Sequence, residues 1–370
     1  ILLERHEILR SVFVEKAGIP QQRIIPHLPV SIPFFESATE IKNDVCEYEF
    51  DLETYPLFKI AILKEDSAHK LYFNMHHSIG DGWSMGIISR DLMDIYAAII
   101  AGKTVELPEL SIQYKDYAQW QNKLLQSPEI TVQENYWKEQ LAGPLSYLQL
   151  PSDYSSKLKK ANTSSSYTVY ITEDKKKKIE ELSRKNGSSV FAVFVAALKI
   201  LLYRLTSEED IIVGIPVANR NHYQLKDLVG CFINTLMLRD KIDENVSFQT
   251  WLQTINGTLI NALAHQNYPF EQLLELIDIP QNDNRFPISP VFLNMVDFDA
   301  KTQEVITEFN PNHEVIVATP KFDMECYIKS FANGYSINCV YDNELFKKET
   351  IQYWINAYLS IIDQVTVSEE

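Results

Sequence analysis

The stretch from residue 75 to residue 84, read MHHSIGDGWS, is the most informative part of this 370-residue chain, because it combines two histidines, an aspartate and a glycine. His76 and His77 follow an apolar run that predicts a strand, and Asp81 and Gly82 open a run that predicts a helix. Histidine can move protons near neutral pH, an aspartate can orient a base, and a glycine leaves its backbone N–H uncovered. Because side chains alternate along a strand, only one of the two histidines can face a given cleft.

A histidine at a strand end is usually satisfied locally and an Asp-Gly pair is usually a turn, so neither feature alone is specific. Together they form the pattern HHxxxDG, which resembles the signature of the condensation domains of nonribosomal peptide synthetases, in the chloramphenicol acetyltransferase-like superfamily. Further stretches carry the same resemblance in the family's order: RHEILRSVF (5–13), YKDYAQW (114–120), YWKEQLAG (136–143), LPSD (150–153), GIPVANR (214–220), VGCFINT (229–235), HQNYPFE (265–271) and RFP (285–287). The family's first motif, expected before Arg5, is absent, so the chain resembles an N-terminally truncated domain.

The resemblance implies an α/β protein with two chloramphenicol acetyltransferase-like subdomains, arranged as a V-shaped pseudo-dimer with a central cleft or tunnel. We expect an N-terminal subdomain at residues 1–160, which carries HHxxxDG, and a C-terminal subdomain at 161–370, because periodicity is lost over 143–166. Apolar spacing predicts helices near 1–10, 41–48, 84–100, 112–125, 132–141, 173–185, 190–205, 247–265 and 348–363. It predicts strands near 12–14, 58–64, 70–76, 167–171, 210–213, 232–239, 291–296, 322–330 and 334–341.

The activity implied is that of an acyltransferase that forms a peptide bond between a donor acyl or peptidyl thioester and an acceptor aminoacyl thioester. The resemblance gives His77 the catalytic place and leaves His76 as scaffold. His77 can act as a general base, or it can orient the amine and stabilise charge; we expect orientation with partial base character, because an aligned amine already attacks a thioester well.

Asp81 has two interpretations: a carboxylate that orients His77, as in a catalytic triad, or one half of a buried ion pair. We expect the ion pair, because the resemblance implies a partner in the RHExLR motif, with Arg5 the first choice and Arg10 the second. The N–H of Gly82 can point at a developing oxyanion, or the glycine can simply permit the turn, and both alternatives stay open.

Three further residues are candidates for the substrate channel: Ser78, Asn294 and Arg285. Ser78 is a nucleophile by type, but the sequence places no base beside it, and the motif is typical of direct transfer without an acyl-enzyme. Asn294 lies in a predicted strand, and Arg285 suits a packing ion pair as well as a substrate contact.

The amino-acid composition argues against several classes of binding partner. The net charge is −16, from 50 acidic and 34 basic residues, which argues against nucleic acid as a partner. No apolar run approaches the roughly 18 residues of a membrane span, so no membrane is expected. The four cysteines lack CxxC spacing, which predicts neither a metal site nor a disulfide framework and suits a cytoplasmic location.

The resemblance implies no cofactor bound by the domain itself, since phosphopantetheine arrives on the partners. Those partners are donor and acceptor peptidyl carrier proteins, beside an adenylation domain of the same synthetase. Two other functions compete: a stand-alone acyltransferase with a soluble acyl donor, and a non-catalytic platform that recruits carrier proteins. The intact histidine pair and aspartate favour the catalytic domain.

Overall fold

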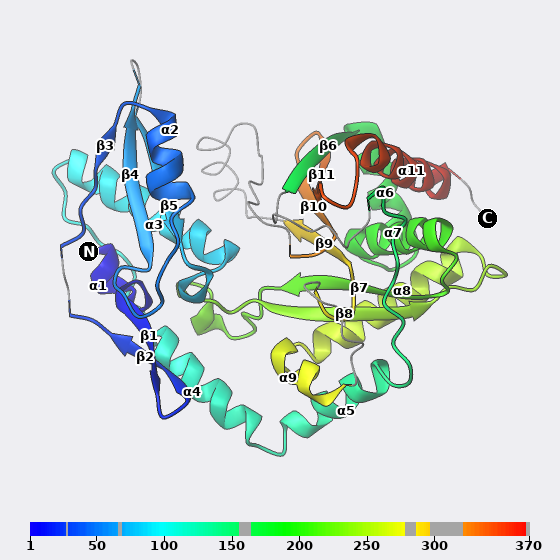
Figure 1. Cartoon of the computed structure of the whole chain (residues 1–370), viewed down its shortest axis with the longest axis horizontal. Helices are drawn as coiled ribbons and strands as arrows, with labels where there is room; N and C mark the ends of the chain where they lie inside the picture. The colour runs from blue at the N-terminus through cyan, green and yellow to red at the C-terminus, as the bar shows by residue number, and fades with distance from the viewer. Residues whose placement is uncertain (27–28, 66–68, 155–163, 278–285, 297–320, 368–370) are drawn as a thin grey trace. The chain divides into compact units, whose positions relative to one another are not determined.

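The structure is a computed structural model and describes residues 1–26, 29–65, 69–154, 164–277, 286–296 and 321–367. Its internal contacts divide the described residues into two compact units, whose elements are labelled in Figure 1. Unit 1 holds the described residues up to Ser127 together with 218–233, and unit 2 holds the described parts of 128–217, 234–296 and 321–367. We call residues 218–233 the strap. They interrupt the sequence of unit 2, between residues 217 and 234, but belong to unit 1.

These bounds differ from the predicted division at residue 160. Helix α4 (Tyr114–Leu125) belongs to unit 1, and unit 2 begins at Pro128, just before α5 (Ile130–Gln140). Proline has no N–H to donate and separates the two helices. Trp137 on α5 is buried, and its indole N–H donates to the carbonyl of His265 at 2.9 Å, which ties α5 to unit 2. The loss of periodicity after residue 143 therefore lies within unit 2.

Unit 1 is built on a three-stranded sheet in the order β3-β4-β5, with a separate two-stranded ribbon of β1 and β2. The β4 and β5 strands are antiparallel, with Phe58 opposite Met75. The strands are β1 (Ser11–Lys16), β2 (Ile19–Ile24), β3 (Phe34–Phe35), β4 (Phe58–Lys64) and β5 (His69–Met75). The helices and helical turns are α1 (Leu2–Arg5), η1 (Glu7–Arg10), α2 (Ala38–Ile41), η2 (Lys42–Cys46), η3 (His77–Ile79), α3 (Gly82–Ile100) and α4.

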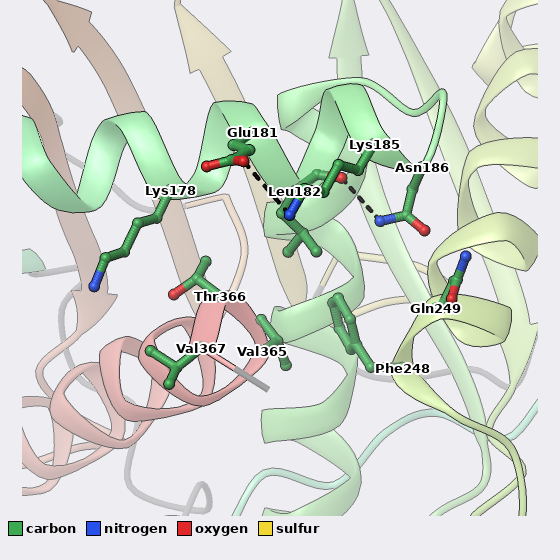
Figure 2. Close-up of a pocket in the computed structure, with 10 residues that line it drawn as sticks. All are labelled: Lys178, Glu181, Leu182, Lys185, Asn186, Phe248, Gln249, Val365, Thr366 and Val367. Atoms are coloured by element: carbon green, nitrogen blue, oxygen red, sulfur yellow. Dashed lines mark hydrogen bonds and ion pairs between the residues drawn. The ribbon is translucent and has the colours of Figure 1, made fainter. Parts of the chain in front are cut away.

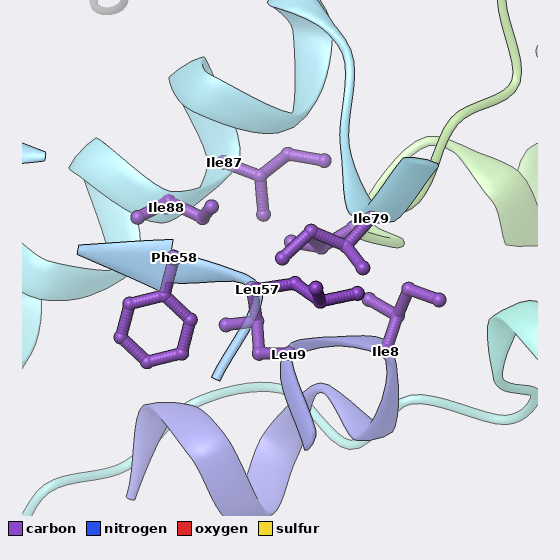
Figure 3. Close-up of a cluster of buried hydrophobic side chains, with 8 residues drawn as sticks. Ile8, Leu9, Leu57, Phe58, Ile79, Ile87 and Ile88 are labelled. Carbon is purple, nitrogen blue, oxygen red and sulfur yellow. The ribbon is translucent and has the colours of Figure 1, made fainter. Parts of the chain in front are cut away.

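The core of unit 1 lies directly beneath the HHxxxDG residues. Ile79, in the middle of the motif, is fully buried and lies close to Leu57 and Ile8 in Figure 3. The remaining members of this cluster come from η1, β4, α3 and the strap: Leu9, Phe58, Ile87, Ile88 and Val229. Burying a side chain such as that of Ile79 stabilises the fold by about 1.5–3 kcal/mol, so the motif is anchored by packing as well as by hydrogen bonds.

Unit 2 contains a six-stranded mixed sheet in the order β6-β11-β10-β9-β7-β8. The pairs β9–β10 and β7–β9 are parallel, and the other neighbours are antiparallel. The strands are β6 (Ser164–Thr172), β7 (Asp210–Val217), β8 (Asn234–Lys241), β9 (Val291–Val296), β10 (Met324–Phe331) and β11 (Gly334–Asp342). The helices are α5, α6 (Glu173–Lys185), α7 (Val190–Thr206), α8 (Phe248–Ala264), α9 (Phe270–Leu276) and α11 (Lys348–Val367), of which α6, α7 and α11 pack together (Figure 1).

Most predicted elements are confirmed within two or three residues, and the strand at 58–64 matches β4 in full. The predicted helix at 1–10 is instead a short α1 followed by the 3-10 turn η1. The predicted strand at 232–239 begins at Asn234, because the preceding residues belong to the strap. Two short strands, β2 and β3, were not predicted, since the exposed, polar β2 carries little apolar alternation.

Unit 2 has a surface hollow of about 400 Å³ where α6, the start of α8 and the end of α11 meet. Its lining residues are drawn in Figure 2. Its lining includes Leu182, Phe248 and Val365, and none of the predicted site residues. In the described residues no single helix is long and apolar enough to cross a membrane. The one pair of helices that passes by length and composition, α6 with α7, is bent by 100°.

Candidate active site

The histidine pair lies where β5 ends and the 3-10 turn η3 begins. The His76 N–H donates to the carbonyl of Leu57 at 2.9 Å, which continues the contact with β4. Its ring Nδ1 accepts the backbone N–H of Ser78 at 3.1 Å, so His76 caps the turn that carries its neighbour. Burial lowers the pKa of His76 and keeps it neutral near pH 7. These contacts are those of a scaffold residue.

Ser78 corrects one expectation. The Ser78 Oγ lies 2.9 Å from His76 Nδ1, so a base does stand beside this hydroxyl. The same nitrogen accepts the Ser78 backbone N–H, and the two residues are only two positions apart. The contact is therefore part of a local cap, in which the serine braces the histidine.

His77 takes the opposite environment to His76. Its side chain is exposed, whereas His76 is half-buried. Both residues follow the end of β5, so the turn η3, and not strand alternation, separates the two side chains. Its ring Nδ1 lies 3.5 Å from the Sγ of Cys231, a half-buried residue of the strap. Of the two histidines of the motif, His77 is thus the one turned outward.

Asp81 is 4% exposed and forms the N-cap of α3. Its Oδ1 accepts both the backbone N–H and the hydroxyl of Ser84, each at 2.8 Å. Its Oδ2 accepts the backbone N–H of Phe232 at 3.1 Å. Arg220 Nη2 donates to both oxygens, at 3.1 and 3.3 Å. The carboxylate therefore has four donors, none of them His77, and the ion-pair interpretation holds.

The predicted partner of Asp81 was wrong. Neither Arg5 nor Arg10 pairs with it: Arg5 Nε donates to Asp91 Oδ2 at 2.9 Å, and Arg10 donates to the carbonyls of Leu3 and Ile25. Asp91 lies ten residues into α3, about 15 Å along the helix from the N-cap. Because α1 packs beside this middle part of α3, Arg5 meets Asp91, and the N-cap takes its arginine from the strap.

Arg220 is 8% exposed and organises the strap around itself. Its Nη1 donates to the carbonyls of Leu225 and Leu228, each at 2.6 Å, so one guanidinium closes two turns of the strap. The guanidinium carbon also lies 4.1 Å from the centre of the Phe232 ring, a cation–π contact. Burial lowers the pKa of Arg220, but an arginine stays charged near neutrality.

Ser84 and Tyr114 fix the end of the strap. The Ser84 Oγ, whose proton goes to Asp81, accepts the Gly230 N–H at 3.1 Å and lies 2.9 Å from the Gly230 carbonyl oxygen. The Tyr114 hydroxyl donates to the carbonyl of Cys231 at 2.8 Å. A Cβ at Gly230 would overlap the Tyr114 ring, so this close approach requires glycine.

Gly82 is the first helical residue of α3, and it is exposed. Its N–H is one of the four at a helix start that have no acceptor within the helix. A Cβ at this position would meet no atom within 4 Å, so packing does not demand a glycine here. Gly82 therefore carries an N–H group at the positive end of a 19-residue helix, with open space where a side chain would stand.

The remaining substrate-channel candidates lie outside unit 1 or outside the described residues. Asn294 is half-buried on β9 in unit 2, opposite Tyr327 of β10. Arg285 lies outside the described residues. The sequence does not predict four neighbours of the motif that the structure reveals: Ser84, Tyr114, Arg220 and Cys231. The stretches GIPVANR and VGCFINT, which resemble family motifs, overlap the two ends of the strap and were the available signal. Among the residues that the structure describes, no three His, Cys, Asp or Glu side chains gather as metal ligands.

A second buried cluster supports α3 from α1. Asp91 Oδ2 lies 2.9 Å from Arg5 Nε and 3.1 Å from His6 Nε2, and Arg90 Nη2 lies 3.1 Å from Asp91 Oδ1. Burial lowers the pKa of His6 more than its bond to Asp91 raises it. Burial of Asp91 opposes ionisation, yet the bond to His6 and the charges of Arg90 and Arg5 keep its pKa below the usual value.

Comparison with known sequences decides the family. The sequence model of the Condensation domain matches residues 1–368. The chain belongs to the condensation domain family. It is 32% identical to Tyrocidine synthase 3 of Brevibacillus parabrevis over 100% of its length, and 32% identical to Bacitracin synthase 3 of Bacillus licheniformis over 98%. It spans only 6% of each of those proteins. The chain is thus a condensation domain of nonribosomal peptide synthesis, and its reaction class is amide-forming acyl transfer.

Solved structures show the same fold. The domain matches the X-domain from teicoplanin biosynthesis with a TM-score of 0.86 at 22% identity, over 99% of this chain and 85% of that one. It matches the condensation domain from Monacolin K polyketide synthase with a TM-score of 0.84 at 18% identity, over 99% and 87%. The chloramphenicol acetyltransferase-like α/β fold expected from the sequence is confirmed.

Asp81→Asn should destabilise the condensation domain strongly. The substitution keeps the shape of the side chain but leaves the Arg220 guanidinium buried without its counter-charge, which costs about 3–5 kcal/mol. Urea unfolding followed by circular dichroism measures this loss. Lys70→Ala is the control, because the Lys70–Glu65 pair is exposed and its removal should not move the transition measurably. A stability equal to wild type for Asp81→Asn would contradict the ion-pair role.

The His6 cluster should make stability fall as the pH is lowered. The folded-state pKa of His6 lies below the unfolded value of about 6.5, so below that pH the unfolded chain binds a proton that the folded chain does not. Stability is therefore complete above pH 6.5 and decreases below it, by at most about 1.4 kcal/mol per pH unit. Urea midpoints from pH 7.5 to 5.5 should slope less in His6→Gln than in wild type; equal slopes would exclude His6 as the source.

Proposed function

We propose that the site around His77 joins two thioesters, with a donor acyl or peptidyl group and an acceptor aminoacyl group each carried on the phosphopantetheine of a carrier protein. The acceptor amine attacks the donor carbonyl carbon, the new C–N bond forms, the C–S bond breaks, and the thiol leaves with a proton. One observation supports this proposal. The side chains of Asp81 and His76 form structural contacts, with Arg220 and with the N–H of Ser78, whereas the side chain of His77 is exposed.

His77 has the right chemistry for the proton that the amine must lose. An imidazole nitrogen that carries a lone pair can accept a proton from a neighbouring amine. A strong base is not needed, since an amine held against a thioester is already a good nucleophile. We therefore assign His77 to orient the amine and to receive its proton as the tetrahedral intermediate forms.

Gly82 is proposed to stabilise the oxyanion. Negative charge develops on the carbonyl oxygen when the amine adds, and a fixed N–H donor at a helix N-terminus favours that charge. Gly82 is exposed, and Asp81 holds this turn of α3 in place through Ser84.

Carrier proteins and an adenylation domain of the same synthetase are the proposed partners. The support is that the curated relatives are far longer, with the matching region covering 5% to 14% of them, so that such a domain works beside others. On this proposal the domain binds no cofactor of its own, because the phosphopantetheine thioesters are part of the substrates.

His77→Ala should reduce amide formation by about 10²-fold, the size typical for loss of a proton-transferring side chain. The assay mixes donor and acceptor carrier proteins loaded with aminoacyl phosphopantetheine and detects the dipeptidyl thioester by mass spectrometry. His69→Ala is the matched control, because His69 is an exposed histidine at the start of β5, the strand that leads into the motif. Product formation by His77→Ala at the wild-type rate would overturn the assignment.

Gly82→Pro tests the proposed oxyanion donor. Proline is tolerated at the first helical position, and Asp81 already has the extended backbone, φ −120° and ψ −177°, that a residue before proline prefers. The substitution replaces the N–H hydrogen with the ring Cδ and should lower the rate by about 10²-fold. Gly82→Ala adds bulk but keeps the N–H, and it should retain most activity. Equal rates for the two variants would show that the N–H is not used.

A further inference from the structure

The contact between Cys231 and His77 joins two residues that lie 154 positions apart and sit on different segments of unit 1. A cysteine that serves only packing is usually fully buried, where it behaves as a small apolar side chain. Cys231 is half-buried, and its sulfur faces the ring of the one histidine that the motif turns outward. We propose that Cys231 is a positioning residue for His77, an inference that rests on the proposed function.

The backbone around Cys231 is held on all sides. The flanking Gly230 N–H is bonded to the Ser84 hydroxyl oxygen, and the Phe232 N–H is bonded to Asp81. The carbonyl of Cys231 itself accepts the Tyr114 hydroxyl. A cysteine side chain has a single rotatable bond before the sulfur, so a fixed backbone leaves few places for Sγ. The hydrogen bonds of Asp81 and Ser84 to the strap backbone thus help to place the Cys231 sulfur, and through it the ring of His77.

The sulfur distinguishes the two ring nitrogens of His77. A neutral imidazole carries one N–H and one lone pair, and the partner of one nitrogen decides the role of the other. A thiol sulfur accepts a hydrogen bond weakly. When Nδ1–H donates to Sγ, Nε2 keeps its lone pair and is the nitrogen that takes the proton of the amine. In the proposed site Cys231 therefore has the task that a carboxylate performs in a triad, with a weaker acceptor.

The test compares Cys231→Ala with Cys231→Ser. Alanine removes the acceptor, whereas serine keeps an oxygen that can accept the same hydrogen bond. Loss of one weak hydrogen bond should lower kcat of amide formation about 3- to 10-fold in Cys231→Ala with KM unchanged, and Cys231→Ser should recover most of it. Cys46→Ala is the control, because Cys46 is the other cysteine of unit 1 and is exposed.

A spectroscopic measurement separates positioning from a structural effect. In the chain labelled with ¹⁵N-histidine, long-range ¹H–¹⁵N spectra report which nitrogen of His77 carries the proton, with assignment by the His77→Ala variant. Wild type and Cys231→Ser should show the Nδ1–H tautomer, and Cys231→Ala a mixture. The same tautomer in all three would overturn the proposal.

The two readouts also keep this inference separate from the proposed function. If wild type forms no amide with any loaded carrier pair, the proposed function fails, while the tautomer measurement still decides whether Cys231 orients His77. If wild type forms amide and Cys231→Ala matches its kcat, the positioning role alone is wrong.

Discussion

The buried ion pair between Asp81 and Arg220 is the interaction on which unit 1 depends. One carboxylate caps α3, balances the guanidinium and receives the Phe232 backbone. Two charges removed from water are stable only when their remaining donors and acceptors are satisfied, and here Ser84 and the strap carbonyls supply most of those partners. Unit 1 is therefore complete only with residues 218–233, which explains why the chain leaves unit 2 between β7 and β8.

This constraint also shapes the chemistry of the motif. A triad carboxylate would hold the histidine and stabilise the imidazolium ion, but the oxygens of Asp81 are already committed to the fold. Thioester aminolysis tolerates this arrangement, because the nucleophile is a neutral amine and the leaving thiol is a good one. A base of ordinary strength is sufficient once the reactants are aligned. On the proposed function, the fold thus uses this buried ion pair to hold the motif in position and leaves proton transfer to the exposed imidazole of His77.

The sequence predicts local features well and long-range pairing poorly. The bounds of β4, α6 and β9 follow from apolar periodicity and helix-start signals, which act within a few residues. The partner of Asp81 lies 139 positions away, and no spacing rule selects Arg220 over Arg5 or Arg10. Likewise the change of unit at Pro128 depends on what each helix packs against, so the gradual loss of periodicity after residue 143 was a misleading signal.

Substitutions at Asp81 affect the stability of unit 1 and its activity together, whereas substitutions at Gly82 and Cys231 can affect the activity alone. A substitution at Asp81 or Arg220 strands a buried charge and releases the strap, so a loss of activity there carries no information about the chemical step. Gly82 and Cys231 differ, because one faces open space and the other contributes a half-buried sulfur held by its neighbours' backbone bonds. Side chains at these positions can change while the Asp81 network stays intact. The proposed chemistry of this domain is therefore best tested by substitutions at Gly82 and Cys231, where the rate of amide formation can change without a change in the free energy of unfolding.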